Sequence, residues 1–467
     1  MKIAFHGAAR TVTGSKHLIT LDNGQKILLD CGMFQGMGKD TDDLNRNFGF
    51  NPTEIDVIVL SHAHIDHCGL IPKLVKDGYS GDIWCTPATK ELATLLMEDS
   101  GRIQENDIKF VNKKRAANGQ QLLLPIYNET DATNAAEYLT TVSDYKEWKK
   151  ILDNVEVMFT DAGHIIGSAS VHLRITENGK TTHLTFSGDV GRYRDVILNS
   201  PDIFPQADVI LIESTYGNKL HKDGISSPDV LLEWINKTCL TKKGKLIIPA
   251  FSVGRTQEIL YALNTLYEQK RLPSLDYIVD SPLSSEATTV IKHHPENFNA
   301  TLQEVMKTDK DPFDFPGLKY TTSVGDSKLL NFKKEPCVII SASGMAEAGR
   351  VKHHISNNIE NSRNTILFSG YCEPHSLGGR LKQHPKEVYI YGILHEVHAE
   401  IAELQSMSAH ADYNDLIQYL SCQNPDLVKK LFLVHGEYEV QQEFRERLLT
   451  KGFKDVEIPA QHEEIKL

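Results

Sequence analysis

The stretch Ser61-His62-Ala63-His64-Ile65-Asp66-His67 carries four side chains that can bind metal ions within six positions. Imidazole and carboxylate ligands without a thiolate suit zinc, manganese or iron, and mixed sets of His and Asp commonly build two-metal hydrolytic sites. Histidines at i and i+2, followed directly by Asp and His, cannot share one face of a regular helix. The stretch therefore predicts a loop that wraps around metal ions, in preference to a polar loop that merely happens to be rich in histidine.

The sequence on either side of this stretch indicates a rigid scaffold. Residues 55–60 form a short apolar run rich in β-branched residues, which is typical of a buried strand. Residues 68–74 begin a helix. The four side chains then lie on a tight turn between a strand and a helix, where they can be aimed at one point.

Asp30 ends a predicted strand at residues 26–30 and precedes Cys31-Gly32. An acidic residue at a strand end beside a metal loop often orients a ligand imidazole from behind. A plain turn-forming aspartate is the other interpretation, and spacing alone does not separate the two.

Two further potential ligands stand at breaks between strands predicted at residues 155–159, 170–175 and 182–186. His164 and Asp189 each have a neighbouring Gly, which lets the backbone approach a crowded centre closely. Alone, each would more often be a loop residue. Together with the His loop they complete a set of ligands.

The pattern of predicted strands and helices changes near residue 215. Before it, short strands alternate with turns and with helices predicted at residues 88–100, 103–117 and 131–139. From about 215 to 404, strands and helices alternate regularly, as expected for parallel βα units. The strands of this part are predicted at residues 245–249, 277–279, 337–341 and 365–369, and the helices at residues 255–270, 286–293 and 349–357.

Several strand ends in this middle part carry Gly and Ser with arginines nearby. In an open α/β sheet, ligands bind beyond the carboxyl ends of the strands, where these residues can meet phosphates. Ordinary βα turn chemistry explains the same residues equally well. The residues concerned are Ser252, Arg255, Ser343, Gly344, Arg350 and Arg380.

Three more residues with acid–base or metal chemistry stand at the ends of predicted elements. Glu213 lies at the end of a buried strand that begins near residue 207, His410 stands between a strand and a helix, and His435 ends a strand that begins at residue 431.

Composition sets broad limits. The chain has 467 residues, of which 40% are hydrophobic and 24% charged, which fits an ordinary soluble globular protein with two or three domains. No apolar run approaches a membrane span, the start reads as a strand and not as a signal peptide, and seven scattered Cys suggest no disulfide framework. We therefore expect a cytoplasmic protein without membrane contact. The net charge of -12 argues against a protein that coats nucleic acid, but allows a nucleic-acid enzyme with a local basic surface.

On these motifs the chain resembles the metallo-β-lactamase superfamily. Residues 61–67 match its HxHxDH motif, and Asp30, His164 and Asp189 match its other ligand motifs in order. The likeness implies an α/β fold, a metallo-β-lactamase αββα sandwich formed by residues 1–214 and 405–467.

Three additional motifs resemble those of the β-CASP nucleases within this superfamily: Glu-Ser-Thr-Tyr-Gly with Glu213, Ser-Ala-His-Ala-Asp-Tyr with His410, and Val-His-Gly-Glu with His435. The likeness implies an inserted parallel α/β β-CASP domain at residues 215–404. RNA-processing members carry His at the third motif, whereas DNA members usually do not, so His435 favours RNA as the substrate. The chain is similar to ribonuclease J and to the nuclease of the pre-mRNA 3′-cleavage complex, in a single-chain bacterial form.

The resemblance also implies roles for the site residues. One Zn²⁺ would be held by His62, His64 and His164, a second by Asp66, His67 and His435, and Asp189 would bridge them, with Mn²⁺ as another suitable ion. A metal-activated hydroxide would cut the RNA phosphodiester and leave 5′-phosphate and 3′-hydroxyl ends. Asp66 and Glu213 would assist catalysis, and His410 would be the general acid, although a substrate-binding or supporting role for His410 stays open.

Several alternatives remain at this point. The same scaffold can hydrolyse a small ester or thioester, act as a 5′-exonuclease on DNA, or serve as a non-catalytic RNA-binding subunit. The sequence does not separate endonucleolytic from 5′-3′ exonucleolytic cutting. Family likeness also implies a possible homodimer.

Overall fold

The computed structural model describes residues 1–142, 145–221, 227–370, 372–404 and 408–467. The chain forms two compact units. Unit 1 comprises residues 1–220 and 410–467, and unit 2 comprises residues 221–409. The predicted domain limits at 214/215 and 404/405 lie a few residues earlier, and the second borders residues 405–407, which are outside the described part. No helix among the described residues combines the length and the apolar composition that crossing a bilayer requires.

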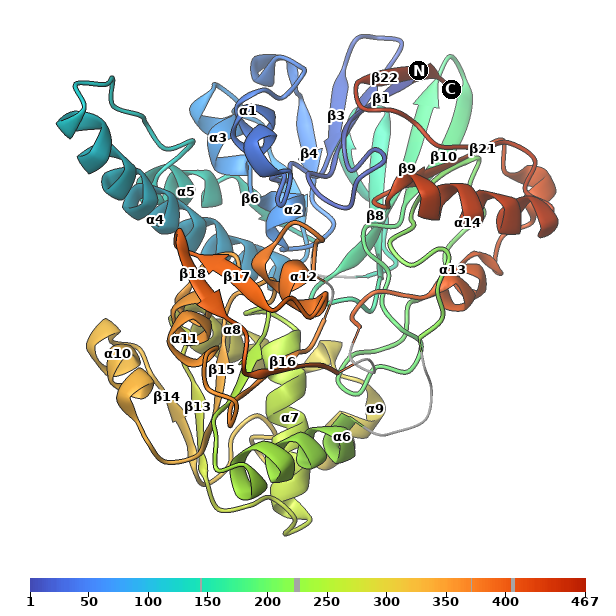
Figure 1. Cartoon of the computed structure of the whole chain (residues 1–467). Coiled ribbons are helices and arrows are strands. Elements are labelled where there is room, and N and C mark those ends of the chain that lie inside the picture. Colours follow the sequence, from blue (N-terminus) through green and yellow to red (C-terminus); the bar gives the residue numbers. More distant parts are fainter. Residues whose placement is uncertain (143–144, 222–226, 371, 405–407) are drawn as a thin grey trace. The chain divides into compact units, whose positions relative to one another are not determined.

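Unit 1 contains two seven-stranded sheets (Figure 1). The first has the order β22-β1-β2-β3-β4-β5-β6, with bounds Glu463–Lys466, Lys2–Gly7, Lys16–Thr20, Lys26–Leu29, Val57–Val59, Ile83–Cys85 and Leu139–Thr141. The second has the order β21-β20-β11-β10-β9-β8-β7, with bounds Val456–Glu457, Lys430–Val434, Val209–Glu213, Lys180–Phe186, Ala169–Glu177, Val155–Asp161 and Lys149–Leu152. The helices are α1 (Thr41–Arg46), α2 (Ile65–Cys68), α3 (Ile71–Lys76), α4 (Pro87–Ala117), α5 (Glu129–Ala136), α13 (Tyr413–Leu420) and α14 (Tyr438–Thr450).

Strand β11 shows why these sheets stack into layers. Val209 and Leu211 belong to the core between the two sheets, which also contains Phe5 of β1. Ile210 and Ile212 point the other way, into a second core with residues of α13 and α14. Because successive side chains of a strand alternate between faces, an all-apolar strand is buried on both sides. This arrangement confirms the predicted αββα sandwich.

Unit 2 is built on a six-stranded sheet in which every pair of neighbours is parallel. This confirms the predicted parallel α/β domain. The order is β14-β13-β15-β12-β16-β19, with bounds Leu318–Tyr320, Asp276–Val279, Cys337–Ser341, Leu246–Pro249, Thr365–Phe368 and Glu400–Glu403. The hairpin β17–β18 spans Glu387–Ile390 and Ile393–Glu396, and the helices are α6 (Ser227–Ile235), α7 (Arg255–Glu268), α8 (Pro282–His293), α9 (Ala300–Val305), α10 (Val324–Phe332), α11 (Arg350–Asn358) and α12 (Leu377–Lys382).

Three helix predictions were wrong in their limits. The helices predicted at residues 88–100 and 103–117 are the single helix α4, because Gly101 does not break it. A Cβ at Gly101 would lie 2.7 Å from the backbone of Asn128, so this glycine allows close packing. The helix predicted at residues 131–139 is α5, which starts earlier because Asn128 and Asp131 form a capping box. Residues 139–141 belong to strand β6 instead.

Candidate metal centre

The His-rich stretch follows β4, as its flanking sequence predicts, but the predicted helix at residues 68–74 was wrong in its limits, because Asp66 and His67 already lie in α2 and the next helix, α3, begins at Ile71. Neighbouring loops fix its backbone: the amide of Ser15 donates to the carbonyl of Asp66 at 2.8 Å, and that of Cys31 donates to the carbonyl of His67 at 2.8 Å. Gly32 packs directly on the Asp66 backbone, since an added Cβ would lie 1.6 Å from the Asp66 carbonyl oxygen. Main-chain contacts alone therefore hold the ligand loop in place.

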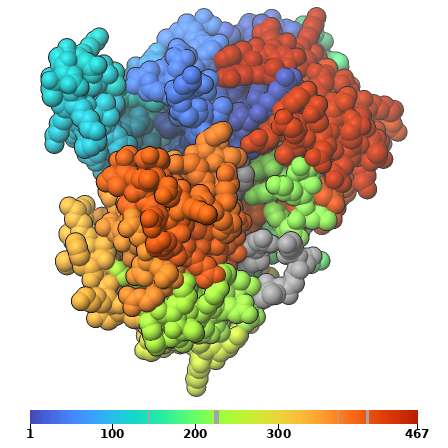
Figure 2. Space-filling model, in the orientation of Figure 1, coloured from blue at the N-terminus to red at the C-terminus, as the bar shows by residue number. Residues whose placement is uncertain are grey.

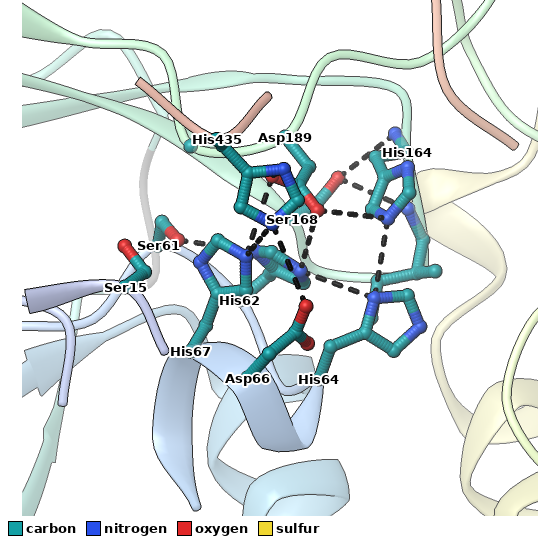
Figure 3. A network of polar contacts seen from close by, with 12 residues as sticks. Ser15, Ser61, His62, His64, Asp66, His67, His164, Ser168, Asp189 and His435 are labelled. Atoms are coloured by element: carbon teal, nitrogen blue, oxygen red, sulfur yellow. Dashed lines mark hydrogen bonds and ion pairs between the residues drawn. The ribbon is translucent and has the colours of Figure 1, made fainter. Parts of the chain in front are cut away.

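Three imidazoles of unit 1 converge on one point (Figure 3). His64 Nδ1 lies 3.2 Å from His62 Nε2 and 3.2 Å from His164 Nε2. Asp189 Oδ2 lies 3.6 Å from the Nε2 atoms of both His62 and His164. His64 comes from the loop, while His164 follows β8 and Asp189 follows β10.

A second group lies on the other side of the Asp189 carboxylate (Figure 3). His67 Nε2 is 3.3 Å from His435 Nε2, and His435 Nε2 is 3.5 Å from Asp66 Oδ2. Asp189 Oδ1 is 3.3 Å from His67 Nε2. Each oxygen of Asp189 thus faces a different group of potential ligands.

The donor atoms fit divalent cations. Within each group the ligand atoms lie within 4.8 Å of one another, and they are imidazole nitrogens and carboxylate oxygens only. Asp189 Oδ1 is buried and accepts no hydrogen bond from the described part of the chain. Because a buried carboxylate oxygen normally has a partner, its position between two histidine groups fits a bridging metal ligand.

His62, His64, Asp66 and Asp189 have the charge states that metal ligands need, whereas at His67 the carboxylates of Asp189 and Asp30 outweigh burial and hold the pKa well above its ordinary value. Burial lowers the pKa of His62 well below its ordinary value and lowers the pKa of His64 to about 4, so both are neutral. Burial alone raises the pKa of Asp66, but the hydrogen bond from His435 and the charges of His67 and His435 lower it to about 2. The same histidines outweigh burial at Asp189 and hold its pKa well below the usual range.

Asp30 supports the second group from behind. Its Oδ2 lies 2.7 Å from Nδ1 of His67, and Oδ1 accepts the backbone amide of Ser61 at 2.8 Å. Ser15 Oγ donates to the same carboxylate at 3.1 Å. Of the two interpretations of Asp30, this geometry favours the one in which it orients a ligand imidazole.

Two site residues adopt left-handed backbone conformations. The φ angles of Asp30 and His435 are 58° and 50°. Non-glycine residues rarely adopt this region, and such strain tends to persist at functional sites. For His435, a hydrogen bond of 2.7 Å from its amide to the carbonyl of Ala8 helps to fix this conformation.

Glu213 and His410 form a pair beside the two groups. His410 Nδ1 lies 3.2 Å from both carboxylate oxygens of Glu213, and Glu213 Oε1 accepts the amide of Val190 at 2.6 Å. Glu213 is fully buried, whereas the His410 side chain is 20% exposed. Burial opposes protonation of His410, but the charge and hydrogen bonds of Glu213, with the charge of Asp189, raise the pKa of His410 to about 9.

Thr215 joins this pair to a potential metal ligand, a link that sequence reasoning missed. Its Oγ1 donates to Glu213 Oε2 at 2.6 Å and lies 3.1 Å from Nδ1 of His435. The hydroxyl therefore accepts from His435 and donates to Glu213. Thr215 belongs to the Glu-Ser-Thr-Tyr-Gly motif, but its role is visible only once His435 is placed in space.

The predicted phosphate contacts lie in unit 2, at the ends of neighbouring strands. The guanidinium of Arg255 is paired with Glu258 and almost fully buried, and Arg350 Nη1 donates to Asp280 Oδ1 at 2.6 Å. These two arginines are therefore engaged inside unit 2. A phosphate contact stays a prediction for the other four residues. Ser252 follows β12, Ser343 and Gly344 follow β15, and Arg380 lies in α12.

Three models of known protein families match the sequence of this chain. A model of the metallo-β-lactamase superfamily matches residues 13–249, more than half of the chain. The chain belongs to the metallo-β-lactamase superfamily. Models of the Beta-Casp domain and of the Zn-dependent metallo-hydrolase RNA specificity domain match residues 256–381 and 394–459. These matches confirm the β-CASP branch and identify a metal-dependent hydrolase.

Several curated relatives of this β-CASP protein align over nearly its whole length. A ribonuclease of Thermus thermophilus is 34% identical over 94% of this chain and 94% of the relative. An RNase J-like protein of Methanocaldococcus jannaschii is 30% identical over 93% of this chain and 92% of the relative. The transcription termination factor FttA of Methanosarcina mazei is 28% identical over 94% of this chain and 67% of the relative.

Proposed function

We propose that this protein is a two-zinc ribonuclease that hydrolyses phosphodiester bonds of RNA. The observation that carries the proposal is the position of Asp189, whose two oxygens face two separate groups of histidines beside the Glu213–His410 pair. Similarity to a ribonuclease and to an RNase J-like protein over nearly the full length supports RNA as the substrate. His62, His64 and His164 would hold one ion, Asp66, His67 and His435 the other, and Asp189 both.

Two bound zinc ions, or manganese ions, would stabilise charge on the phosphate and lower the pKa of water at the site. The residues of the chain orient the side chains that would hold these ions. Asp30 fixes the ring of His67 through Nδ1, and Thr215 fixes that of His435 in the same way. With these rings immobilised, the phosphodiester meets ligands whose geometry does not have to reorganise during the reaction.

His410 fits the role of general acid. Glu213 accepts the hydrogen bond of Nδ1, and Nε2 would protonate the departing 3′ oxygen. The products would carry 5′-phosphate and 3′-hydroxyl ends. Bound cations would oppose protonation of His410, and the buried Glu213 carboxylate counteracts this effect.

The decisive experiment compares three substrates with the metal-replete protein. We expect cleavage of RNA labelled at either end, no cleavage of single-stranded DNA at a comparable rate, and no hydrolysis of p-nitrophenyl acetate beyond the background rate. Mass spectrometry of the products should show 5′-phosphate and 3′-hydroxyl ends, and elemental analysis should show about two zinc ions per chain. Preferential hydrolysis of the ester would support a small-molecule hydrolase instead, and RNA binding without EDTA-sensitive cleavage would support a non-catalytic subunit.

The remaining details belong to the same proposal. A time course with RNA labelled at each end separates endonucleolytic from 5′-3′ exonucleolytic cutting. A homodimer and a cytoplasmic location are kept as expectations, the first to be measured by analytical ultracentrifugation and the second by cell fractionation.

A further inference from the structure

The second half of α4 and the loop that follows it form an arm of unit 1, defined here as residues 102–124. The arm stands out from the rest of unit 1 and is coloured cyan in Figures 1 and 2. Most of its residues are exposed, among them the large apolar side chains Phe110 at 62% and Leu124 at 77%. Phe110 thus presents its aromatic ring to solvent.

The arm is basic in a chain that is acidic overall. Residues 102–124 include five cationic residues and two acidic ones, a net charge of +3, whereas the whole chain has a net charge of -12; the cationic residues are Arg102, Lys109, Lys113, Lys114 and Arg115, and the acidic ones are Glu105 and Asp107. In the part of the chain that the structure describes, no carboxylate lies within ion-pair distance of Lys109, Lys113 or Lys114. The positive charge of the arm is therefore available to a polyanion.

The side chains are arranged in two adjacent rows. Residues four apart are neighbours on a helix, so Lys109 lies beside Lys113 and Phe110 beside Lys114. The ammonium of Lys114 is 5.0 Å from the centre of the Phe110 ring. An exposed aromatic ring flanked by cations is the composition of surfaces that bind single-stranded nucleic acid.

The loop of the arm backs the opposite side of the helix. Asn112 Nδ2 donates to the carbonyl of Leu123 at 2.9 Å, and the Leu123 amide donates to Asn112 Oδ1 at 2.9 Å. Arg115 Nε donates to the carbonyl of Gln121 at 2.6 Å. With about 3.6 residues per turn, Asn112 points away from the row of Phe110 and Lys114. The loop therefore supports the helix, and the four side chains of the two rows are all exposed.

We propose that this arm binds single-stranded RNA, with Lys109, Lys113 and Lys114 on backbone phosphates and Phe110 stacked on a base. The inference rests on the proposed ribonuclease function and adds a substrate-binding surface outside the metal centre. Charge complementarity favours RNA over a protein partner, because Phe110 is flanked by three lysines that form no ion pair with the described residues. Discrimination by base identity is not expected, since phosphate contact and stacking are tolerant of sequence.

The test measures binding of a fluorescein-labelled 30-nucleotide RNA by anisotropy at several salt concentrations. All proteins carry His410→Ala to slow cleavage, and a gel checks that the RNA stays intact. The variant combines Lys109→Gln, Lys113→Gln and Lys114→Gln. The control combines Lys180→Gln, Lys451→Gln and Lys466→Gln, which removes the same charge from exposed positions on other elements of unit 1. We expect at least tenfold weaker binding for the arm variant only.

The salt dependence sharpens this test. Each phosphate contact on a single strand contributes about -0.7 to the slope of log K against log salt. Loss of three contacts should make the slope less negative by about two, while the control keeps the parent slope. An arm variant that behaves like its control would overturn the proposal.

Phe110 provides an independent test. Phe110→Leu keeps an apolar side chain but loses the aromatic face, and Phe110→Tyr keeps that face. We expect the Leu variant to bind RNA at least fivefold more weakly and the Tyr variant to bind normally. If both variants bind RNA normally while Leu122→Ser with Leu124→Ser changes the sedimentation coefficient, the arm is a protein interface and the RNA proposal is wrong.

A small substrate separates this inference from the proposed function. With His410 restored, hydrolysis of bis(p-nitrophenyl) phosphate by the arm variant should equal that of the parent. Thr89 of α4 contacts Gly167 in the loop that carries His164, and Lys109 lies roughly 30 Å further along the helix, beyond the reach of so small a diester. RNA binding that depends on the arm in a protein that cuts no RNA would refute the ribonuclease function and leave the arm as an RNA-binding surface. RNA cleavage with an unchanged KM in the arm variant would refute the arm alone.

Discussion

His410 belongs to neither of the two His-rich ligand groups and is paired instead with the buried carboxylate of Glu213. Both oxygens of Glu213 lie 3.2 Å from its Nδ1, and Glu213 is itself held by the amide of Val190. We expect His410→Ala to reduce kcat on RNA by about 10²- to 10⁴-fold, the usual contribution of a general acid.

The same variant should retain its zinc, since neither His-rich ligand group includes His410. Single-turnover cleavage and elemental analysis of the same preparation check both statements. A rate near that of the wild type, with unchanged metal content, would remove His410 from the acid role.

Thr215 acts through two other residues and touches no substrate. Its hydroxyl accepts from His435 Nδ1 and donates to Glu213, so it fixes both the ring of a metal ligand and the partner of His410. Loss of such a supporting hydrogen bond typically weakens metal binding by about 10- to 100-fold. We expect Thr215→Val to lose zinc to a competing chelator at correspondingly lower chelator concentrations and to show a lower kcat with little change in KM.

Thr215→Ser is the matched control, because it keeps the hydroxyl and removes only a methyl group. It should restore both zinc retention and kcat. Equal behaviour of the Val and Ser variants would show that packing, and not the hydrogen bonds, is what Thr215 contributes.

At the scale of elements, Lys16 ties together two loops that hold the metal stretch. It is fully buried on β2, and its Nζ donates to the carbonyls of Gly14 at 2.9 Å and Gly32 at 2.8 Å. No carboxylate of the described residues pairs with it, although its ammonium lies 4.2 Å from the centre of the Phe34 ring. Burial lowers the pKa of Lys16 from 10.5 to about 8.

This shift predicts a pH-dependent stability. Between pH 8 and 10.5 the unfolded chain keeps the Lys16 proton and the folded chain has lost it, so this group makes folding more favourable as pH rises. Each unit of pKa difference corresponds to about 1.4 kcal/mol, which gives up to about 3 kcal/mol over this window. Buried Cys and Tyr residues act in the opposite sense, so the wild type alone does not isolate the effect.

The test therefore measures the difference in the free energy of unfolding between the wild type and a Lys16 variant. Urea unfolding of the wild type and of Lys16→Met at pH 7, 8, 9 and 10 should show the free energy of unfolding of the wild type rising relative to the variant as pH increases. Lys180→Met, at an exposed position of β10, should keep a constant difference. A constant difference for Lys16→Met as well would mean that Lys16 stays charged in the folded protein.

The elements also show how far sequence reasoning reaches. The His-rich turn was predictable because its strand, its loop and its helix are contiguous, and the parallel sheet of unit 2 because apolar strands alternate with helical patterns. The continuity of α4 through Gly101 could not be predicted, because the glycine is required by close packing against the Asn128 backbone, which comes from a later segment. Hairpin β17–β18 was missed although its turn at Tyr391 and Gly392, with φ of 53° and 78°, carries a Gly.

The site follows the same rule. Family likeness assigned His62 and His435 to one centre, but spacing could not, because 373 positions of chain separate them and only the pairing of β11 with β20 brings His435 to the loop. The role of Thr215 depends on a contact with His435 across this distance. Likewise β22, a polar strand without an apolar pattern, is recognisable only through its pairing with β1.

At the scale of the whole molecule, the topology explains how unit 1 accommodates an insertion. Strands β11 and β20 are parallel neighbours, and the chain leaves unit 1 after the first and returns before the second. A bridge between Tyr216 and Asp412 places the points of exit and return side by side. Both His410 and His435 come after the insertion, so the metal centre is complete only when the returning chain has folded onto unit 1.

Because every proposed metal ligand belongs to unit 1, removal of metal should destabilise that unit and spare the other. A ligand at 100 times its dissociation constant stabilises a folded state by about 2.7 kcal/mol per site. The three tryptophans report the units separately, since Trp84 and Trp148 lie in unit 1 and Trp234 lies in unit 2. We expect EDTA to lower the thermal midpoint of Trp234→Phe fluorescence by about 5 °C or more.

The double variant Trp84→Phe, Trp148→Phe reports unit 2 through Trp234 and should keep its midpoint in EDTA. Equal shifts in both variants would mean that the two units unfold as one cooperative structure despite their separate cores. No shift in either would mean that the purified protein holds no stabilising metal, and the two groups of ligands around Asp189 would then need another explanation. The pattern of one shifted and one unshifted transition is specific to a metal centre that unit 1 completes by itself, with ligands from both sides of the insertion.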